Sequence, residues 1–282
     1  LYWKLVGAVP ATEVLAHRVL WSLVFMMIVL VIARKLGSFW TELKALLTHR
    51  KRLVGISLAT VFISINWGLY IWAVANDRLI EASLGYYINP LVSILLGIIV
   101  LKEKLSTLQA IAFGVAAVGV LNLTINFGQF PWVAITLALS FGVYGLLKKM
   151  VQLGALVGLA IETLLITPIA LLYLMFLPWE GAFGSTPGLT LLLIVAGIAT
   201  AVPLLLFASA AKRIPLSMVG LLQYIAPTIT LILGVFLFNE TFTPVHLFSF
   251  VCIWTALTLY TLSITKSRKL TKKVPVTLSE GK

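Results

Sequence analysis

Three ionisable side chains lie well inside long apolar runs of this sequence: His17, Arg18 and Glu162. A charged side chain at the centre of a bilayer costs roughly 3 kcal/mol on insertion scales, so it needs a partner or a wet cavity and commonly marks a solute or proton pathway. Glu13 lies one helical turn before His17 and offers it a local partner. For Arg18, the sequence leaves structural anchoring and substrate contact open. For Glu162 we favour a functional or proton-linked role, because it is the only carboxylate deep in a predicted span.

Uncharged polar and aromatic residues extend this set. Asn66 and Tyr70 share a helix face at i and i+4, as do Ser140 and Tyr144. A pocket with apolar walls and a few polar groups suits small amphipathic metabolites, although each residue also fits ordinary packing between helices. The predicted substrate-cavity residues are His17, Arg18, Asn66, Trp67, Tyr70, Tyr86, Tyr87, Asn89, Ser140, Tyr144, Glu162, Gln223 and Tyr224.

A pattern of proline, glycine and glutamate occurs twice with identical spacing. It comprises Pro90, Gly97 and Glu103 in the first half, and Pro227, Gly234 and Glu240 in the second. Each proline lacks a backbone donor and loosens the helix around it. Small residues on the same face permit either close helix packing or a polar pathway, and the sequence leaves both open. We take the two prolines and two glycines as candidates for helix breaking or gating, and expect the glutamates to cap or anchor neighbouring loops.

The composition restricts the class of protein. With 61% hydrophobic residues, 11% charged residues and a mean hydropathy of +1.08, the chain is too apolar for a water-soluble globule and belongs in a bilayer. The net charge of +12 does not indicate nucleic-acid binding, because the basic residues lie in short clusters between apolar runs. Cys252 is the only cysteine, so the chain can build neither an intramolecular disulfide nor a cysteine metal site. We expect no metal and no cofactor.

Runs of about 20 apolar residues, the length that crosses a hydrocarbon core, predict an all-α polytopic membrane protein. The predicted spans are 12–33, 53–75, 83–101, 107–125, 131–147, 155–177, 188–211, 216–238 and 244–265. Residues 1–9 are expected to end a further, truncated first helix, which makes ten. Most of the 21 Lys and Arg lie in alternate loops and in the tail, which indicates that these segments and the C-terminus are cytoplasmic.

The two copies of the motif lie in spans separated by an odd number of crossings, so the second copy has the opposite orientation. We therefore predict two inverted five-helix repeats, at residues 1–125 and 131–265, followed by a basic cytoplasmic tail at 266–282. Arg18 and Glu162 occupy matching positions in the two halves, at mirrored depths. A direct ion pair between them is not expected.

Several segments carry a resemblance to a known family. They are Leu-Tyr-Trp-Lys-Leu at 1–5, Glu13 with His17-Arg18-Val19, Asn66-Trp67 with Ile71-Trp72-Ala73-Val74, Glu81-Ala82-Ser83-Leu84-Gly85-Tyr86 with Ile88-Asn89-Pro90-Leu91, Ile161-Glu162-Thr163, and Gln223-Tyr224-Ile225 with Pro227-Thr228. With these segments the chain resembles the RarD-type permeases of the EamA family, in the drug/metabolite transporter superfamily. The resemblance implies ten helices in two inverted repeats, cytoplasmic termini, a central cavity between the repeats, and transport of small metabolites or drugs. Members of this group are associated with chloramphenicol sensitivity, and related permeases export amino acids.

These observations predict a secondary transporter in a bacterial inner membrane, working by alternating access and driven by an ion gradient or by the substrate gradient. The alternative is a non-transporting membrane protein that uses small-residue helix faces for assembly. An intramembrane enzyme is not expected, because Asp77 is the only aspartate and no HExxH, phosphate-loop or dinucleotide motif is present. The predicted partners are a small-molecule substrate and the lipid bilayer. The sequence does not indicate the oligomeric state.

Overall fold

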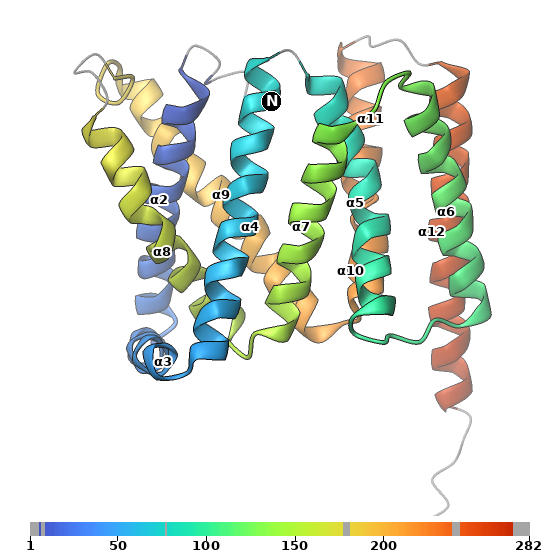
Figure 1. The fold of residues 1–282 in the computed structure, drawn as a ribbon, viewed down its shortest axis with the longest axis horizontal. Coiled ribbons are helices and arrows are strands. Elements are labelled where there is room, and N and C mark those ends of the chain that lie inside the picture. Colours follow the sequence, from blue (N-terminus) through green and yellow to red (C-terminus); the bar gives the residue numbers. More distant parts are fainter. Residues whose placement is uncertain (1–5, 7–8, 77, 177–180, 239–242, 273–282) are drawn as a thin grey trace, which may run out of the picture.

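The computed structural model describes residues 6, 9–76, 78–176, 181–238 and 243–272, and these form helices joined by turns and loops. Most helices run side by side across the molecule (Figure 1). The bounds, in chain order, are α2 (Ala11–Ile32), α3 (Leu36–Thr48), α4 (Arg50–Ala75), α5 (Leu79–Ile99), α6 (Thr107–Asn126), α7 (Trp132–Met150), α8 (Ala155–Met175), α9 (Pro187–Arg213), α10 (Leu216–Leu222), α11 (Ile225–Phe238) and α12 (Pro244–Lys272). Within these ranges nine segments are long and apolar enough to cross a membrane, which confirms the all-α membrane fold.

Some sequence predictions fall outside the described residues. Residues 1–5 and 7–8 of the expected truncated helix belong there, as do Glu240 and residues 273–282. Gly234 lies within α11, but its surroundings are not described. The helix α12 continues through the first residues of the predicted tail, as far as Lys272.

One helix was absent from the sequence prediction. The segment 34–52, expected to be a loop, contains the helix α3, which has 13 residues. Leu36, Phe39, Leu43 and Leu46 recur at intervals of three or four, so one side of the helix is apolar. With 13 residues, this apolar pattern is shorter than the run of about 20 that predicts a membrane span.

The predicted span 216–238 is broken into two helices. α10 ends at Leu222 and α11 begins at Ile225, with Gln223 and Tyr224 in a turn. Pro227 has no N–H to bond the carbonyl of Gln223, so the helical ladder is interrupted there. Pro90 lies at the equivalent point of the first copy, yet α5 remains continuous around it.

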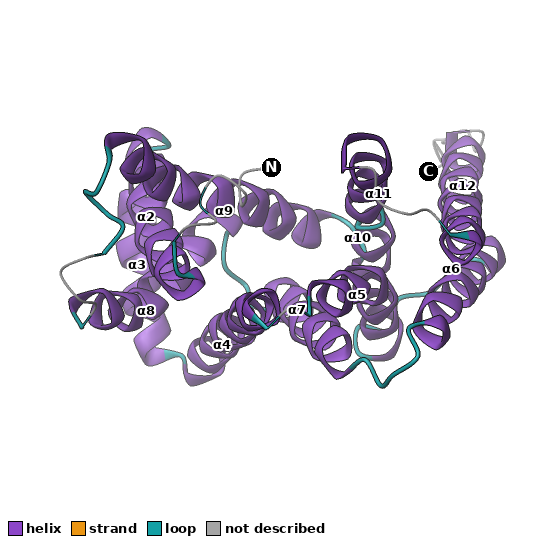
Figure 2. Ribbon diagram, turned by 90° about the horizontal axis from the view of Figure 1, so that it is seen from above, coloured by secondary structure: helices purple, strands orange, loops and turns teal. Residues whose placement is uncertain are grey.

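Helices from the two halves of the chain pack against each other in matching pairs. α2 packs on α8, α5 on α10, and α6 on α12 (Figure 2). Glycine allows the closest approach between α5 and α10, since a Cβ on Gly220 would lie 2.8 Å from the carbonyl oxygen of Pro90. A Cβ on Gly97 would lie 3.1 Å from the backbone nitrogen of Ser217. Gly97 therefore lies in a helix contact.

The loops at 33–35, 100–106, 151–154 and 214–215 lie at one end of the bundle, the lower end in Figure 1, which we call the basic end. Here Glu103 connects two helices of opposite halves. Its Oε1 accepts a hydrogen bond of 2.6 Å from the backbone nitrogen of Leu216. Its Oε2 accepts bonds from the backbone nitrogen and the hydroxyl of Ser217, at 2.9 and 2.8 Å. The carboxylate thus caps α10.

We expect Glu103→Ala to lower the free energy of unfolding by about 1–2 kcal/mol, because the first amides of α10 lose their acceptors. Denaturant titration in a fixed detergent measures this. Glu42→Ala is the matched control, since Glu42 pairs with Arg52 at a part-exposed site and should contribute less than about 1 kcal/mol. Equal losses in the two variants would contradict the capping role.

Candidate functional site

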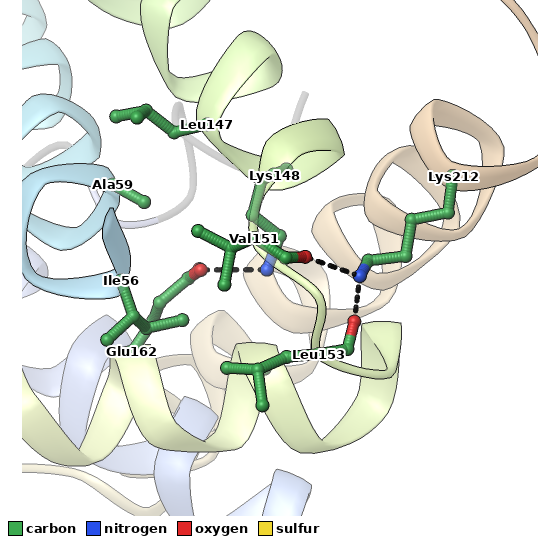
Figure 3. A pocket seen from close by; sticks show the side chains of 9 residues that line it. Ile56, Ala59, Leu147, Lys148, Val151, Leu153, Glu162 and Lys212 are labelled. Atoms are coloured by element: carbon green, nitrogen blue, oxygen red, sulfur yellow. Dashed lines mark hydrogen bonds and ion pairs between the residues drawn. The ribbon is translucent and has the colours of Figure 1, made fainter. Parts of the chain in front are cut away.

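A buried ion pair joins α7 and α8. Glu162 on α8 and Lys148 on α7 each expose only 3% of their side chains, and Lys148 Nζ lies 2.8 Å from Glu162 Oε1. Figure 3 shows the two side chains pointing toward each other. The hydroxyl of Tyr144 donates to the other carboxylate oxygen, Oε2, at 3.2 Å. Tyr144 and Lys148 are one helical turn apart, so a single face of α7 holds both oxygens of Glu162.

The first of two pockets lies on the basic-end side of this ion pair. It is a small cavity of about 10 Å³, which is room for roughly one water molecule. Besides Lys148 and Glu162, a second cation lines it: Lys212 at the end of α9, whose Nζ donates to the carbonyls of Val151 and Leu153 (Figure 3). The other lining residues are Ile56, Ala59, Leu147, Val151, Leu153 and Gly158.

The second pocket lies on the other side of the ion pair and is equally small, at about 10 Å³. Trp67, Tyr144 and Glu162, three of the predicted cavity residues, line it together. The remaining lining residues are Thr60, Ile63, Leu159, Thr163, Ile166 and Leu204. Glu162 is the residue common to both pockets.

Sequence reasoning missed Lys148 and Lys212, which it assigned to a loop charge cluster. The predicted span ended at 147, whereas α7 continues to Met150 and carries Lys148 into the protein interior. The spacing of four residues between Tyr144 and Lys148 was the available signal, because it places a hydroxyl and a cation on one helix face.

Arg18 contacts Trp67, one of the residues that line the second pocket. Its guanidinium lies over Trp67, 5.4 Å from the ring centroid, and Arg18 Nε donates to Thr200 Oγ1 at 2.9 Å. These contacts connect α2 to α4 and α9. The face of the indole ring attracts the positive charge of the guanidinium, which offsets part of its lost contact with water.

His17 lies apart from both pockets. Its ring stacks on Phe183 with centroids 5.0 Å apart, and its Nε2 lies 4.0 Å from Glu13 Oε1. Glu13 Oε1 in turn accepts a hydrogen bond of 2.7 Å from the backbone nitrogen of Ala182. Glu13 and His17 are buried, and they bind α2 to the loop before α9.

Two further buried carboxylates, Glu13 in α2 and Glu81 in α5, lie in the first turn of their helices, whereas Glu162 lies farther inside α8. Glu13 and Glu81 each expose 2% of their surface. Glu81, expected in a loop, lies in α5, where it accepts from the backbone nitrogen of Val133 at 2.8 Å and pairs with Arg78 at 3.1 Å. Both carboxylates accept from loop or helix-end amides, whereas Glu162 is held by two side chains and lines the pockets.

Several other predicted residues fill helix contacts. Asn66 Nδ2 donates to the carbonyl of Leu137 at 2.9 Å and to Ser140 Oγ at 3.0 Å, which joins α4 to α7. Tyr70 and Tyr86 meet edge to face with centroids 6.1 Å apart. Tyr87 packs edge to face on Phe250 at 5.6 Å.

The break between α10 and α11 contains a polar pair that the two pockets do not include. Asn89 Nδ2 on α5 donates to Gln223 Oε1 at 2.6 Å, while Asn89 Oδ1 and Gln223 Nε2 are buried without a partner. Exchanging O and N in both amides would still leave one donor group and one acceptor unused. The hydroxyl of Tyr224 is also buried without a partner. Three predicted residues thus meet at the interrupted helix.

The chain is similar to known membrane transporters. The model of the EamA-like transporter family matches the chain twice, over residues 2–125 and 131–262. The chain is 52% identical to the uncharacterized transporter YojE of Bacillus subtilis, over 96% of this chain and 91% of that protein. It is 41% identical to the protein RarD of Escherichia coli, over 96% of this chain and 92% of that protein. A solved crystal structure covers 93% of this chain and 91% of its own with a TM-score of 0.70; at 18% identity this likeness concerns the fold alone.

Proposed function

The chain belongs to the EamA-like transporter family and is a multi-pass membrane transporter, and from this premise we propose that it is a secondary transporter of small metabolites or drugs. In this proposal the substrate passes through the pockets on either side of Glu162 while the two halves of the protein alternate access. We propose no enzymatic role, in keeping with the transporter names of its relatives.

We further propose that residues 1–125 and 131–265 are inverted repeats. The double match of the family model supports this, as does the packing of α2, α5 and α6 on α8, α10 and α12. The basic end is proposed to face the cytoplasm of a bacterial cell, with the protein in the inner membrane and its C-terminus inside, because Lys and Arg concentrate at cytoplasmic loops. Residues 266–282 then form a basic cytoplasmic tail.

The observation that carries the proposal is the position of Glu162, which lines both pockets and is held by Lys148 and Tyr144. Uptake of a proton by the carboxylate would remove its charge and release Lys148 from the ion pair. The freed cation would then be available to an anionic or polar group of a substrate in the pocket next to Lys212. Loss of the proton would restore the pair. Glu162 is therefore proposed to couple proton and substrate movement.

Purified protein in liposomes with a pH gradient tests this, using a panel of radiolabelled amino acids and chloramphenicol. We expect proton-dependent flux above that of empty vesicles, and we expect Glu162→Gln to lower it about tenfold and remove its dependence on the gradient. Glu162→Gln leaves the charge of Lys148 buried without its partner. The double variant Lys148→Met/Glu162→Gln removes both charges and should show the same loss of proton-dependent flux.

Glu13→Gln is the control, since Glu13 is equally buried but lies outside both pockets. It should keep the gradient dependence. Unchanged flux and unchanged pH dependence in both Glu162 variants would make the residue structural. Absence of flux by the wild type over a broad panel would instead favour the alternative of a non-transporting assembly protein.

A further inference from the structure

The short helix α3 lies across the basic end of the bundle. In Figure 1 it is seen end-on, whereas the neighbouring helices α2, α4 and α8 are seen from the side. Phe39 and Leu46 are each 1% exposed and pack into the core formed with those three helices. Since the surrounding helices cross the membrane, the axis of α3 runs roughly parallel to the membrane surface, at the level where the spans end.

One flank of α3 is apolar and uncovered by the described protein. Trp40 is 50% exposed and Leu47 is 71% exposed, and their separation of seven residues places them on the same side of the helix. Tryptophan is enriched where a membrane meets water, because its ring is apolar and its N–H is polar. The pair is therefore suited to the boundary between headgroups and acyl chains.

The same helix is flanked by exposed cations. Arg34, Lys35, Lys44, Arg50 and Lys51 are all exposed, and the ion pairs among the described residues engage none of them. Glu42 is the single acidic residue of the segment 34–52, and Arg52 already holds it at 2.7 Å. The surface around α3 thus has an excess of positive charge.

We propose that α3 and its flanking residues bind the headgroups of anionic phospholipids, with Trp40 and Leu47 inserted beneath them. An amphipathic helix with apolar residues on one flank and cations beside them binds a membrane surface in this way. Charge complementarity selects the occupant, because a neutral partner would leave five cations uncompensated, while an anionic leaflet attracts each of them. The proposal requires only that the chain spans a bilayer and does not depend on transport or on Glu162.

Thermal unfolding of the full chain in neutral micelles doped with phosphatidylglycerol or phosphatidylcholine of the same acyl chains tests the headgroup. We expect phosphatidylglycerol to raise the unfolding midpoint more than phosphatidylcholine, and added salt to reduce the difference. Lys44→Gln/Lys51→Gln should abolish at least half of it. Lys102→Gln/Lys104→Gln, a matched loss of two exposed cations at the same end, should retain it.

Three other outcomes of this experiment would contradict the proposal. Equal losses in the two variants would indicate unspecific attraction to the basic end, and no preference for phosphatidylglycerol would overturn the site. Stabilisation of equal size by inorganic phosphate or glycerol phosphate in phosphatidylcholine micelles would assign the cations to a soluble anion instead.

A second experiment tests whether Trp40 and Leu47 are inserted in the membrane. After Cys252→Ser, nitroxide labels attached to Trp40→Cys and Leu47→Cys in phosphatidylglycerol-containing liposomes should be relaxed more by oxygen than by a water-soluble nickel complex. The label at Lys44→Cys should show a larger nickel effect. Nickel-dominated relaxation at positions 40 and 47 would mean that a soluble protein or water covers the flank, and would overturn insertion.

Discussion

A Lys148→Met variant is expected to lose about 3–5 kcal/mol of its free energy of unfolding, because it leaves the Glu162 carboxylate buried without its cation. Both side chains are 3% exposed and their charged atoms are 2.8 Å apart, so water compensates poorly for the missing amine. Tyr144 still donates one hydrogen bond to Glu162, but a neutral donor does not balance the charge. Acidification should restore part of the loss, since protonation of Glu162 removes the unpaired charge.

Denaturant titration in one detergent measures this, with Lys149→Met as the matched control. Lys149 is the next residue, but its side chain is 24% exposed and donates to the carbonyls of Ala211 and Ile214. Its loss should therefore be smaller. Lys148→Met/Glu162→Gln should be more stable than Lys148→Met alone, because it contains no uncompensated charge. If the double variant is less stable than the single one, the ion pair is not the source of the effect.

A Gly197→Ala variant should push α2 away from α9 and lower the free energy of unfolding by about 1–3 kcal/mol. A Cβ at this position would lie 2.3 Å from the carbonyl carbon of Trp21 and 2.5 Å from the backbone nitrogen of Ser22. These are backbone atoms, which cannot rotate away as a side chain can. The bond from Ser22 Oγ to the carbonyl of Gly197, now 3.0 Å, would be strained by the same shift.

Gly188→Ala, on the same helix, is the control for Gly197→Ala. A Cβ there would meet nothing within 4 Å, and alanine costs less backbone entropy than glycine, so stability should stay level or rise slightly. The unfolding midpoints of the two variants in one detergent measure the difference. Equal midpoints for the two variants would contradict the close approach of α2 and α9.

The long helices could be predicted from the sequence because each is a run of apolar residues of nearly fixed length. α8 illustrates this, since the predicted span 155–177 differs from Ala155–Met175 only at its end. The helix α3 could not be predicted in this way, because its apolar side, with Phe39 and Leu46, extends over only 13 residues, too few for a membrane span. The sequence named both Pro90 and Pro227 as helix-breaking candidates but could not tell them apart, because they occupy equivalent sites; only the helix with Pro227 is interrupted.

The candidate site was partly predictable. Glu162 was identified because a carboxylate in an apolar run is costly, and that argument needs only local sequence. The partner on α7 was not, since a lysine next to a loop normally extends toward water. Its spacing from Tyr144 places the two side chains on one helix face but does not show that this face turns inward. The pairing of Asn89 with Gln223 depends on how α5 crosses the broken helix, a geometry that follows from packing at Gly220 rather than from either residue.

The pairing of α6 with α12 has a consequence for biosynthesis. α6 packs mainly on α12, through contacts such as Asn122 Nδ2 with Ser249 Oγ at 2.9 Å, and only slightly on α5. During translation α6 enters the membrane long before α12 emerges from the ribosome. Its Asn122 amide, and the small residues Ala112, Ala116 and Gly119 that are buried in the complete protein, are then in contact with lipid or with an insertion factor. Nascent chains released before residue 244 would keep that face without the helix that covers it in the complete protein.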